Sequence, residues 1–224
     1  MFQMEVKMKE AQVFWNEKYK EERNLWGFQP KEMLLHYEKV IPSKGKILDL
    51  GVGEGKNALY FASRGYVVEG VDISDTAIDR CRHYASEAGL DMKTTVADLA
   101  EYSIAPGSCS LIILSNVLNF FHDDTIKRIV QKVKEGLVDG GMVYIHAFDV
   151  HDPSLDKRRH LVVDEFTNTV FNPKTKGYTH YFTKDELEGI FQGYKVIYSS
   201  QSLQLDLGHG EPHYHGLVEL LVKK

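Results

Sequence analysis

Three glycines alternate with other residues in the segment Asp49-x-Gly51-x-Gly53-x-Gly55. The segment follows the apolar run 46–50 and precedes a stretch of good helix formers, so we expect a turn between a buried strand and a helix. Glycine allows the backbone to turn tightly there and to approach a ligand that a Cβ atom would exclude. Ligands of open α/β sheets bind at this kind of turn, which makes the loop a candidate binding site; a tight turn without a ligand is the alternative.

Acidic residues also end the next two predicted strands. Asp72 follows the run 66–71, and Asp98 follows the run 92–97. A carboxylate at the first position can accept hydrogen bonds from both hydroxyls of a ribose, and one at the second can accept from an adenine amino group. A single acid at a strand end is more often only solvated. With Asp49, however, three successive strands end in one, which favours a shared binding site.

The charges of the loop discriminate between two adenosine cofactors. A dinucleotide-binding loop would have glycine at the position of Lys56, and Asp49 and Glu54 would repel a pyrophosphate. S-adenosylmethionine has no phosphate and carries a sulfonium and an ammonium group, which these acids would attract, so the loop favours this cofactor. An NAD(P)-dependent oxidoreductase and a cofactor-binding protein without catalysis are the alternatives. A P-loop is excluded, because the chain has no Gly-x-x-x-x-Gly-Lys-Ser/Thr segment.

These residues need a sheet that brings the strand ends together. Apolar runs and amphipathic segments alternate five times over about 100 residues, which predicts a doubly wound α/β fold with a parallel sheet and helices on both faces. A final antiparallel pair would make the sheet mixed at one edge. The expected strands are 46–50, 66–71, 92–97, 111–114, 142–147, 195–205 and 214–222, and the expected helices are 57–64, 75–88, 123–137 and 185–191.

We expect residues 1–224 to form one domain. Four parts differ in composition and periodicity: a helical lid rich in aromatic residues, a cofactor-binding core, a long connection on the substrate side that shows no sustained period, and a helix with a terminal antiparallel hairpin. Their ranges are 1–40, 41–148, 149–182 and 183–224.

Composition narrows the class of protein and of partner. The chain has 224 residues, and 27 basic against 32 acidic residues give a net charge of −5 with both signs interspersed, so no basic stripe for nucleic acid is present. The longest apolar stretch, 111–121, is interrupted by polar residues and is too short for a membrane span, and the N-terminus has no signal-peptide core. Two cysteines are too few for a disulfide framework. We therefore expect a cytoplasmic monomer or homodimer that acts on a small-molecule substrate, with neither a nucleic-acid nor a membrane partner.

The same features resemble the class I S-adenosylmethionine-dependent methyltransferases. The resemblance covers about residues 40–150 and rests on the glycine loop, the strand-end acids and the Leu-Val-Asp-Gly-Gly turn at 137–141. Within it, residues 49–72 resemble the tellurite-resistance subgroup. An upstream aromatic pattern is similar to that of thiopurine-type methyltransferases and consists of Trp15, Tyr19 and Trp26.

The resemblance implies a Rossmann-like, seven-stranded mixed sheet of order 3-2-1-4-5-7-6. Val52 and Ser110 depart from the family's frequent cysteine and usual acid, and neither departure removes a predicted cofactor contact. The three upstream aromatic residues could stack on adenine or lie near the sulfonium, or they could form only the core of the lid. With them, the predicted contacts to S-adenosylmethionine are Trp15, Tyr19, Trp26, Asp49, Gly51, Gly53, Gly55, Asp72, Ile73, Asp98, Leu99 and Ser115.

The acceptor of the methyl group is less well determined. Methyl transfer from a sulfonium depends largely on positioning and desolvation, so no catalytic triad is expected and the catalytic residues stay unknown. The segment 115–118 (Ser-Asn-Val-Leu) differs from the Asn-Pro-Pro-Tyr type of enzymes that methylate nucleobase or glutamine amino groups. A small acceptor is therefore expected: the resemblance implies a chalcogen oxyanion (tellurite or selenite), and a thiol would fit equally well. The candidate substrate contacts, which could also be solvated loop residues, are Arg158, Arg159, Tyr178 and His180.

A histidine-rich segment, 208–216, lies at the predicted terminal hairpin. His213 and His215 would point to the same face, and His209 could approach them across the turn. Three imidazoles can hold a divalent metal ion, but this spacing matches no zinc signature. We expect a polar hairpin tip without a metal, and metal binding by these three histidines is the alternative.

Overall fold

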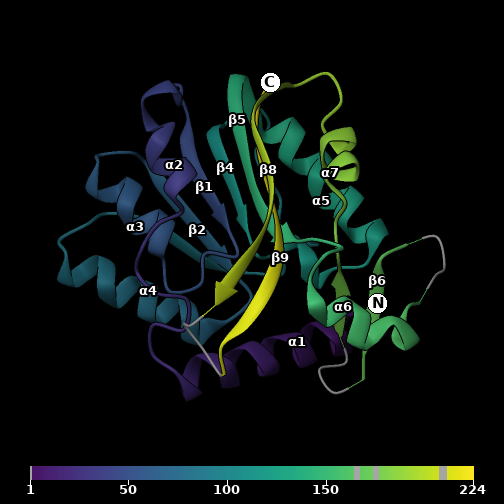
Figure 1. Cartoon of the computed structure of the whole chain (residues 1–224). Helices are drawn as coiled ribbons and strands as arrows, with labels where there is room; N and C mark the ends of the chain where they lie inside the picture. The colour runs from purple at the N-terminus through teal and green to yellow at the C-terminus, as the bar shows by residue number, and fades with distance from the viewer. Residues whose placement is uncertain (1, 164–166, 174–176, 207–210) are drawn as a thin grey trace.

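A seven-stranded sheet forms the centre of the computed structural model, which describes residues 2–163, 167–173, 177–206 and 211–224. The strand order is β3-β2-β1-β4-β5-β9-β8 (Figure 1), as the sequence predicts. β1 to β5 are parallel, whereas β9 is antiparallel to both β5 and β8. The strands are β1 (Lys46–Leu50), β2 (Val68–Asp72), β3 (Lys93–Val96), β4 (Cys109–Ser115), β5 (Leu137–Phe148), β8 (Lys195–Asp206) and β9 (His213–Lys223).

Helices cover both faces of this sheet, and one long helix crosses the edge where the parallel strands end (Figure 1). On one face lie α2 (Glu32–His36), α3 (Lys56–Ser63) and α4 (Asp75–Glu87), and on the other lie α5 (Asp123–Gly136) and α7 (Lys184–Ile190). The helix at the edge is α1 (Phe2–Glu21). In the described part of the chain, no helix is both long and apolar enough to cross a membrane.

Most residues of the central strands are apolar because both faces of these strands are buried. In β4, Ile112 and Leu114 pack into the core under α5 and α7, whereas Leu111 and Ile113 pack into the core under the other helices. α5 buries one apolar stripe, Ile126, Ile129, Val130 and Val133. The parallel pairing of β1 to β5 brings the carboxyl ends of these strands to one edge of the sheet.

Two expectations about loops are wrong. The turn expected at 139–141 belongs to β5, which begins at Leu137; the pairing with β4 shifts register beyond Cys109, and Gly140 adopts a φ of +72°. A glycine in that conformation is typical of a β-bulge, which the sequence cannot distinguish from a turn.

The connection 149–182 also contains regular structure. It forms α6 (Pro153–Arg158) and a two-stranded sheet of β6 (Thr169–Asn172) and β7 (Gly177–His180). Elements of four to six residues are too short to produce a sustained hydrophobic period, which explains the miss. Leu155, Val170 and Tyr181 form a small core of their own beneath these elements.

Candidate active site

A cavity of about 1570 Å³ lies between α1 and the carboxyl ends of the parallel strands. It reaches from the glycine loop to the hairpin of β8 and β9 and to β7. Of the predicted cofactor contacts, those that line it are Trp15, Tyr19, Trp26, Gly51, Gly53, Asp72, Ile73, Asp98, Leu99 and Ser115.

The glycine loop is shaped by contacts as well as by its turn. Gly51 and Gly53 have φ values of +76° and +56°, which strongly favour glycine. A Cβ atom on Gly53 would lie 2.7 Å from the hydroxyl oxygen of Tyr19, so this glycine also lets the lid approach the loop. Gly55 does not line the cavity; a Cβ there would lie 2.7 Å from the sulfur of Cys81, so its role is in packing.

Asp72 is held in place by the backbone on both sides. One carboxylate oxygen accepts a hydrogen bond from the amide of Gly53 and the other from the amide of Ser74, each at 2.9 Å. Burial of the side chain raises the pKa of this carboxyl group. Each oxygen has a further lone pair, so the carboxylate can still accept hydrogen bonds from a ligand in the cavity.

Asp49 lies behind the glycine loop rather than on the cavity wall. Its side chain is 1% exposed, and its Oδ2 atom has no hydrogen-bond partner among the described residues. Burial raises the pKa of this carboxyl group to about 7, and the positive charge of Lys56 partly opposes the shift. A buried carboxylate oxygen without a donor is a site that an ammonium or sulfonium group would stabilise.

The lid is anchored to the glycine loop by Glu54. Its carboxylate accepts hydrogen bonds from the backbone amides of Asn24 and Leu25, at 3.1 and 2.8 Å, and forms an ion pair with Arg80 at 3.1 Å. The anchored segment places the indole of Trp26 against Tyr19, with a hydrogen bond of 3.2 Å. The aromatic lid residues therefore roof the cofactor end of the cavity.

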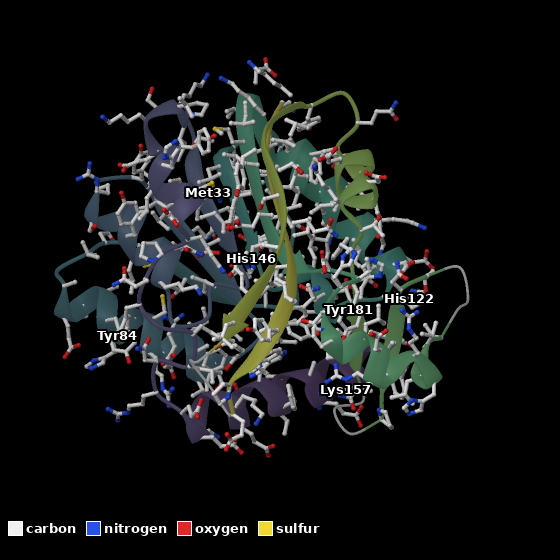
Figure 2. All side chains as sticks on the ribbon, in the orientation of Figure 1. Met33, Tyr84, His122, His146, Lys157 and Tyr181 are labelled. Atoms are coloured by element: carbon white, nitrogen blue, oxygen red, sulfur yellow. The ribbon has the colours of Figure 1, made fainter. Side chains whose placement is uncertain are left out.

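Three polar residues meet in the other half of the cavity, and we call them the Lys31 cluster. The ammonium nitrogen of Lys31 lies 2.9 Å from Nε2 of His146, and Nδ1 of His146 lies 2.5 Å from Oδ1 of Asn116. An amide oxygen can only accept, so Nδ1 carries the imidazole proton and Nε2 accepts from Lys31. His146 lies at the centre of the molecule (Figure 2).

Burial changes the protonation of the Lys31 cluster. It lowers the pKa of Lys31 to about 8, with a further contribution from the like charge of Lys56. It also lowers the pKa of His146 well below its usual range, so the imidazole is neutral. Asn116 adopts a φ of +54°, a conformation that is uncommon outside glycine and often found at functional sites. A lysine that is partly neutral near pH 8 can accept a proton.

The sequence analysis missed this cluster, although two signals were available. His146 is the one strongly polar residue within the predicted strand 142–147, and Asn116 directly follows the central strand β4. Lys31 had no signal, since it lies in a loop that only the fold brings over the strand ends.

The predicted substrate contacts divide into two pairs. Arg158 and Tyr178 line the cavity, whereas Arg159 and His180 do not. Arg159 is 68% exposed and pairs with Asp156 within its own helical turn. His180 is 2% exposed and belongs to the core, where its ring nitrogens lie 2.7 Å from Thr169 and 2.9 Å from Glu186. In this structure neither residue faces the cavity: Arg159 is exposed beside Asp156, and Thr169 and Glu186 hold His180 in the core.

Comparison with known proteins finds a family match over part of the chain. Residues 47–141, which hold the glycine loop and both strand-end acids, match the sequence model of the methyltransferase domain. This part of the chain therefore matches a methyltransferase domain, in agreement with the resemblance to the class I S-adenosylmethionine-dependent methyltransferases. The match covers residues 47–141, so Lys31, His146 and the β8–β9 hairpin lie outside it.

The chain has curated relatives whose names state different activities. It is 30% identical over 122 residues to a 2-heptyl-1-hydroxyquinolin-4(1H)-one methyltransferase of Mycobacteroides abscessus, covering 54% of each chain. It is 29% identical over 101 residues to the probable S-adenosylmethionine-dependent methyltransferase TehB of Haemophilus influenzae, covering 45% of this chain and 35% of the relative. The aligned parts thus span about half or less of these relatives, which leaves the tellurite-resistance subgroup unestablished.

Solved structures agree with the chain in fold. The crystal structure of TehB has a TM-score of 0.69 at 18% identity, with 93% of this chain and 66% of that one covered. A Burkholderia thailandensis 1,6-didemethyltoxoflavin-N1-methyltransferase, solved with its substrate and S-adenosylhomocysteine, has a TM-score of 0.67 at 16% identity, with 96% and 84% covered.

The residues present fit S-adenosylmethionine, the methyl donor of this family. The buried Oδ2 atom of Asp49 lacks a donor among the described residues, and the hydroxyl of Ser115, on the cavity wall, is likewise without one there. Asp72 and Asp98 line the same end of the cavity, where the lid aromatics close over them. A cationic, phosphate-free adenosine compound matches this set of acceptors and aromatic faces.

Proposed function

We propose that this protein transfers the methyl group of S-adenosylmethionine to a nucleophilic atom of a small molecule. The observation that carries the proposal is the continuity of the cavity, which joins the glycine loop and strand-end acids to the Lys31 cluster under one lid. Asp72 would hold the ribose hydroxyls, Asp98 and Leu99 would face the adenine, and Asp49 would stabilise the positive charge of the methionine part through the loop. When bound, the cofactor supplies an activated methyl group.

In this proposal, Lys31 is the general base. Its pKa of about 8 leaves a fraction of neutral amine, which can take the proton of an acceptor O–H, N–H or S–H group while donating one N–H to His146. A sulfonium in the same cavity would disfavour the charged ammonium further. Asn116 fixes the tautomer and orientation of His146, so Asn116 and His146 are positioning residues.

The acceptor we propose is a small molecule with an ionisable proton. The cavity exceeds the roughly 300–1,000 Å³ of a typical single-ligand site, so it has room for a second molecule besides the cofactor. Trp15 and Phe120, whose rings meet edge to face with centroids 4.9 Å apart, and Phe148 would suit a flat ring. Arg158 would suit an anion, which keeps tellurite, selenite and thiols among the candidates.

Both cysteines are buried and free, which supports a cytoplasmic location.

Two measurements test this proposal. Calorimetry with S-adenosylhomocysteine should give saturable binding, and no heat at millimolar ligand would refute a cofactor site. A screen for release of S-adenosylhomocysteine should then compare hydroxylated heteroaromatic compounds, thiols, selenite and tellurite. Turnover of one class identifies the acceptor, whereas binding of cofactor without turnover of any class would indicate a cofactor-binding protein without catalysis.

A further inference from the structure

Two histidines and an aspartate converge at the end of the β8–β9 hairpin where the connecting loop joins the strands, and we call them the hairpin triad: Asp206, His213 and His215. Their candidate ligand atoms lie within 4.8 Å of one another. The pairing of Asp206 with His213 and the two-residue spacing of the histidines place all three on one face of the hairpin. The third histidine of the sequence expectation, His209, lies outside the described residues.

Each imidazole of the hairpin triad is oriented by an oxygen that can only accept. Nδ1 of His213 lies 2.8 Å from the backbone oxygen of Glu211, and Nδ1 of His215 lies 2.9 Å from a carboxylate oxygen of Asp152. Both Nδ1 atoms therefore carry the proton, which leaves a lone pair on each Nε2 atom. These two Nε2 atoms face each other at 3.0 Å, an arrangement that a cation between them stabilises.

His215 is fixed in the way that metal ligands usually are. The side chain of Asp152 is 1% exposed and also accepts from the amides of Ser154 and Gly216, at 2.8 and 3.2 Å. The ring of His215 stacks on Phe148, with centroids 5.0 Å apart. A carboxylate that holds the second nitrogen of a histidine is a common partner of metal-bound imidazole.

We propose that the hairpin triad binds a divalent transition-metal ion of the zinc class. Metal–nitrogen distances are about 2.0–2.1 Å in zinc sites. If the nitrogen–metal–nitrogen angle lies between a right angle and the tetrahedral angle, the two nitrogen atoms are roughly 2.9–3.4 Å apart, which agrees with the separation of the two Nε2 atoms. Oδ2 of Asp206 lies 3.8 Å from Nε2 of His215, and a small side-chain rotation would bring it into the same range. Two histidines and one carboxylate leave coordination positions open, as in catalytic rather than structural sites.

The open coordination positions would face the half of the cavity that holds the Lys31 cluster, which we call the acceptor half, because Asp206 and His215 line the cavity wall. A bound metal ion could there hold an anionic oxygen or sulfur atom of the acceptor. This use of the site rests on the proposed function, whereas the existence of the site does not. Metal binding is therefore measured without cofactor or acceptor, so that its failure is distinct from a failure of cofactor binding.

The experiment is equilibrium dialysis of the untagged chain against zinc, with metal content measured by mass spectrometry. We expect one zinc ion per chain, and at least about tenfold weaker binding in His213→Ala and in His215→Ala. Asp152→Asn, which changes only the orienting group, should weaken binding by about 10–100-fold. His83→Ala removes an exposed histidine of α4 and is the matched control, expected to bind as the parent does.

Zinc X-ray absorption of the unmodified chain removes the dependence on variants that fold poorly. Two imidazoles among the ligands would support the hairpin triad. The proposal would be overturned if the parent chain bound no more zinc than the double variant His213→Ala/His215→Ala, or if the spectrum showed no imidazole ligand. A proton shared between the two rings would then explain the short distance between their Nε2 atoms.

Discussion

The two halves of the cavity are built in different ways. The cofactor half uses the loops after β1, β2 and β3, which lie close together in the sequence, and its polar groups are largely held by nearby backbone amides. The acceptor half joins Lys31, Asn116 and His146 with residues of α6, β7 and the β8–β9 hairpin. The difference indicates that the proposed cofactor contacts come largely from one stretch of the sequence, apart from the lid, whereas the proposed acceptor contacts join distant segments.

The largest expected effect concerns the acceptor half alone. Replacing Lys31 by methionine removes the proposed base at similar side-chain length, so kcat should fall by about 10²–10⁴-fold. Affinity for S-adenosylhomocysteine should stay within about threefold, measured by calorimetry. Lys44→Met, at an exposed position, is the control. A Lys31→Met variant with parental kcat would remove the general base from the mechanism.

A smaller effect, in the opposite half, is expected for Asp72→Ala. Loss of charged hydrogen bonds to the ribose should weaken cofactor affinity by about 1–3 kcal/mol, roughly 5–150-fold. Asp79→Ala, an exposed acid of α4, should leave affinity unchanged. Because Asp72 also holds the amides of Gly53 and Ser74, Asp72→Asn provides a variant of the same shape. Unchanged affinity in both variants would mean that the ribose binds elsewhere.

Glu54→Ala tests whether the lid belongs to the cofactor half. The variant loses the acceptor of two backbone amides and of Arg80, so the segment 22–27 should exchange its amide hydrogens faster. Cofactor affinity should fall by about 5–30-fold, as expected for one or two lost charge-assisted hydrogen bonds. Glu32→Ala, at an exposed acid of α2, is the comparison. Faster exchange without a change of affinity would show that the lid does not contribute to cofactor binding.

The smallest effect comes from Asp49. Its pKa of about 7 in the free protein lies above the usual value because of burial, so part of the population is protonated below pH 7. A cationic ligand favours the carboxylate, lowers this pKa and releases a proton on binding. Affinity should therefore rise by about three- to tenfold from pH 6 to pH 8.

Proton release can be measured by calorimetry in buffers of different ionisation enthalpy. The other charged groups that act on Asp49 are Lys56 and Asp72. Asp49→Asn has nearly the same side-chain shape and should abolish the proton release. If the affinity for the cofactor still depended on pH in this variant, the proton would come from another group.

Much of the fold was predictable because its signals are local. The five apolar runs end at one edge of the sheet, and the acids after them are brought together by the parallel arrangement itself. The bulge at Gly140 and the short elements α6, β6 and β7 were missed, since their conformations depend on the neighbours that they pack against. His180 shows the same limit: only the orientation of β7 decides that it is buried in the core rather than exposed to the cavity.

The sequence by itself determined the sheet, the glycine loop and the strand-end acids, because hydrophobic periodicity and glycine spacing act within one strand–helix unit. The tertiary structure decided that Lys31 meets His146 and that Asp152 orients His215. Contacts between residues more than 60 positions apart depend on how whole elements pack, and no periodicity in the chain records that packing.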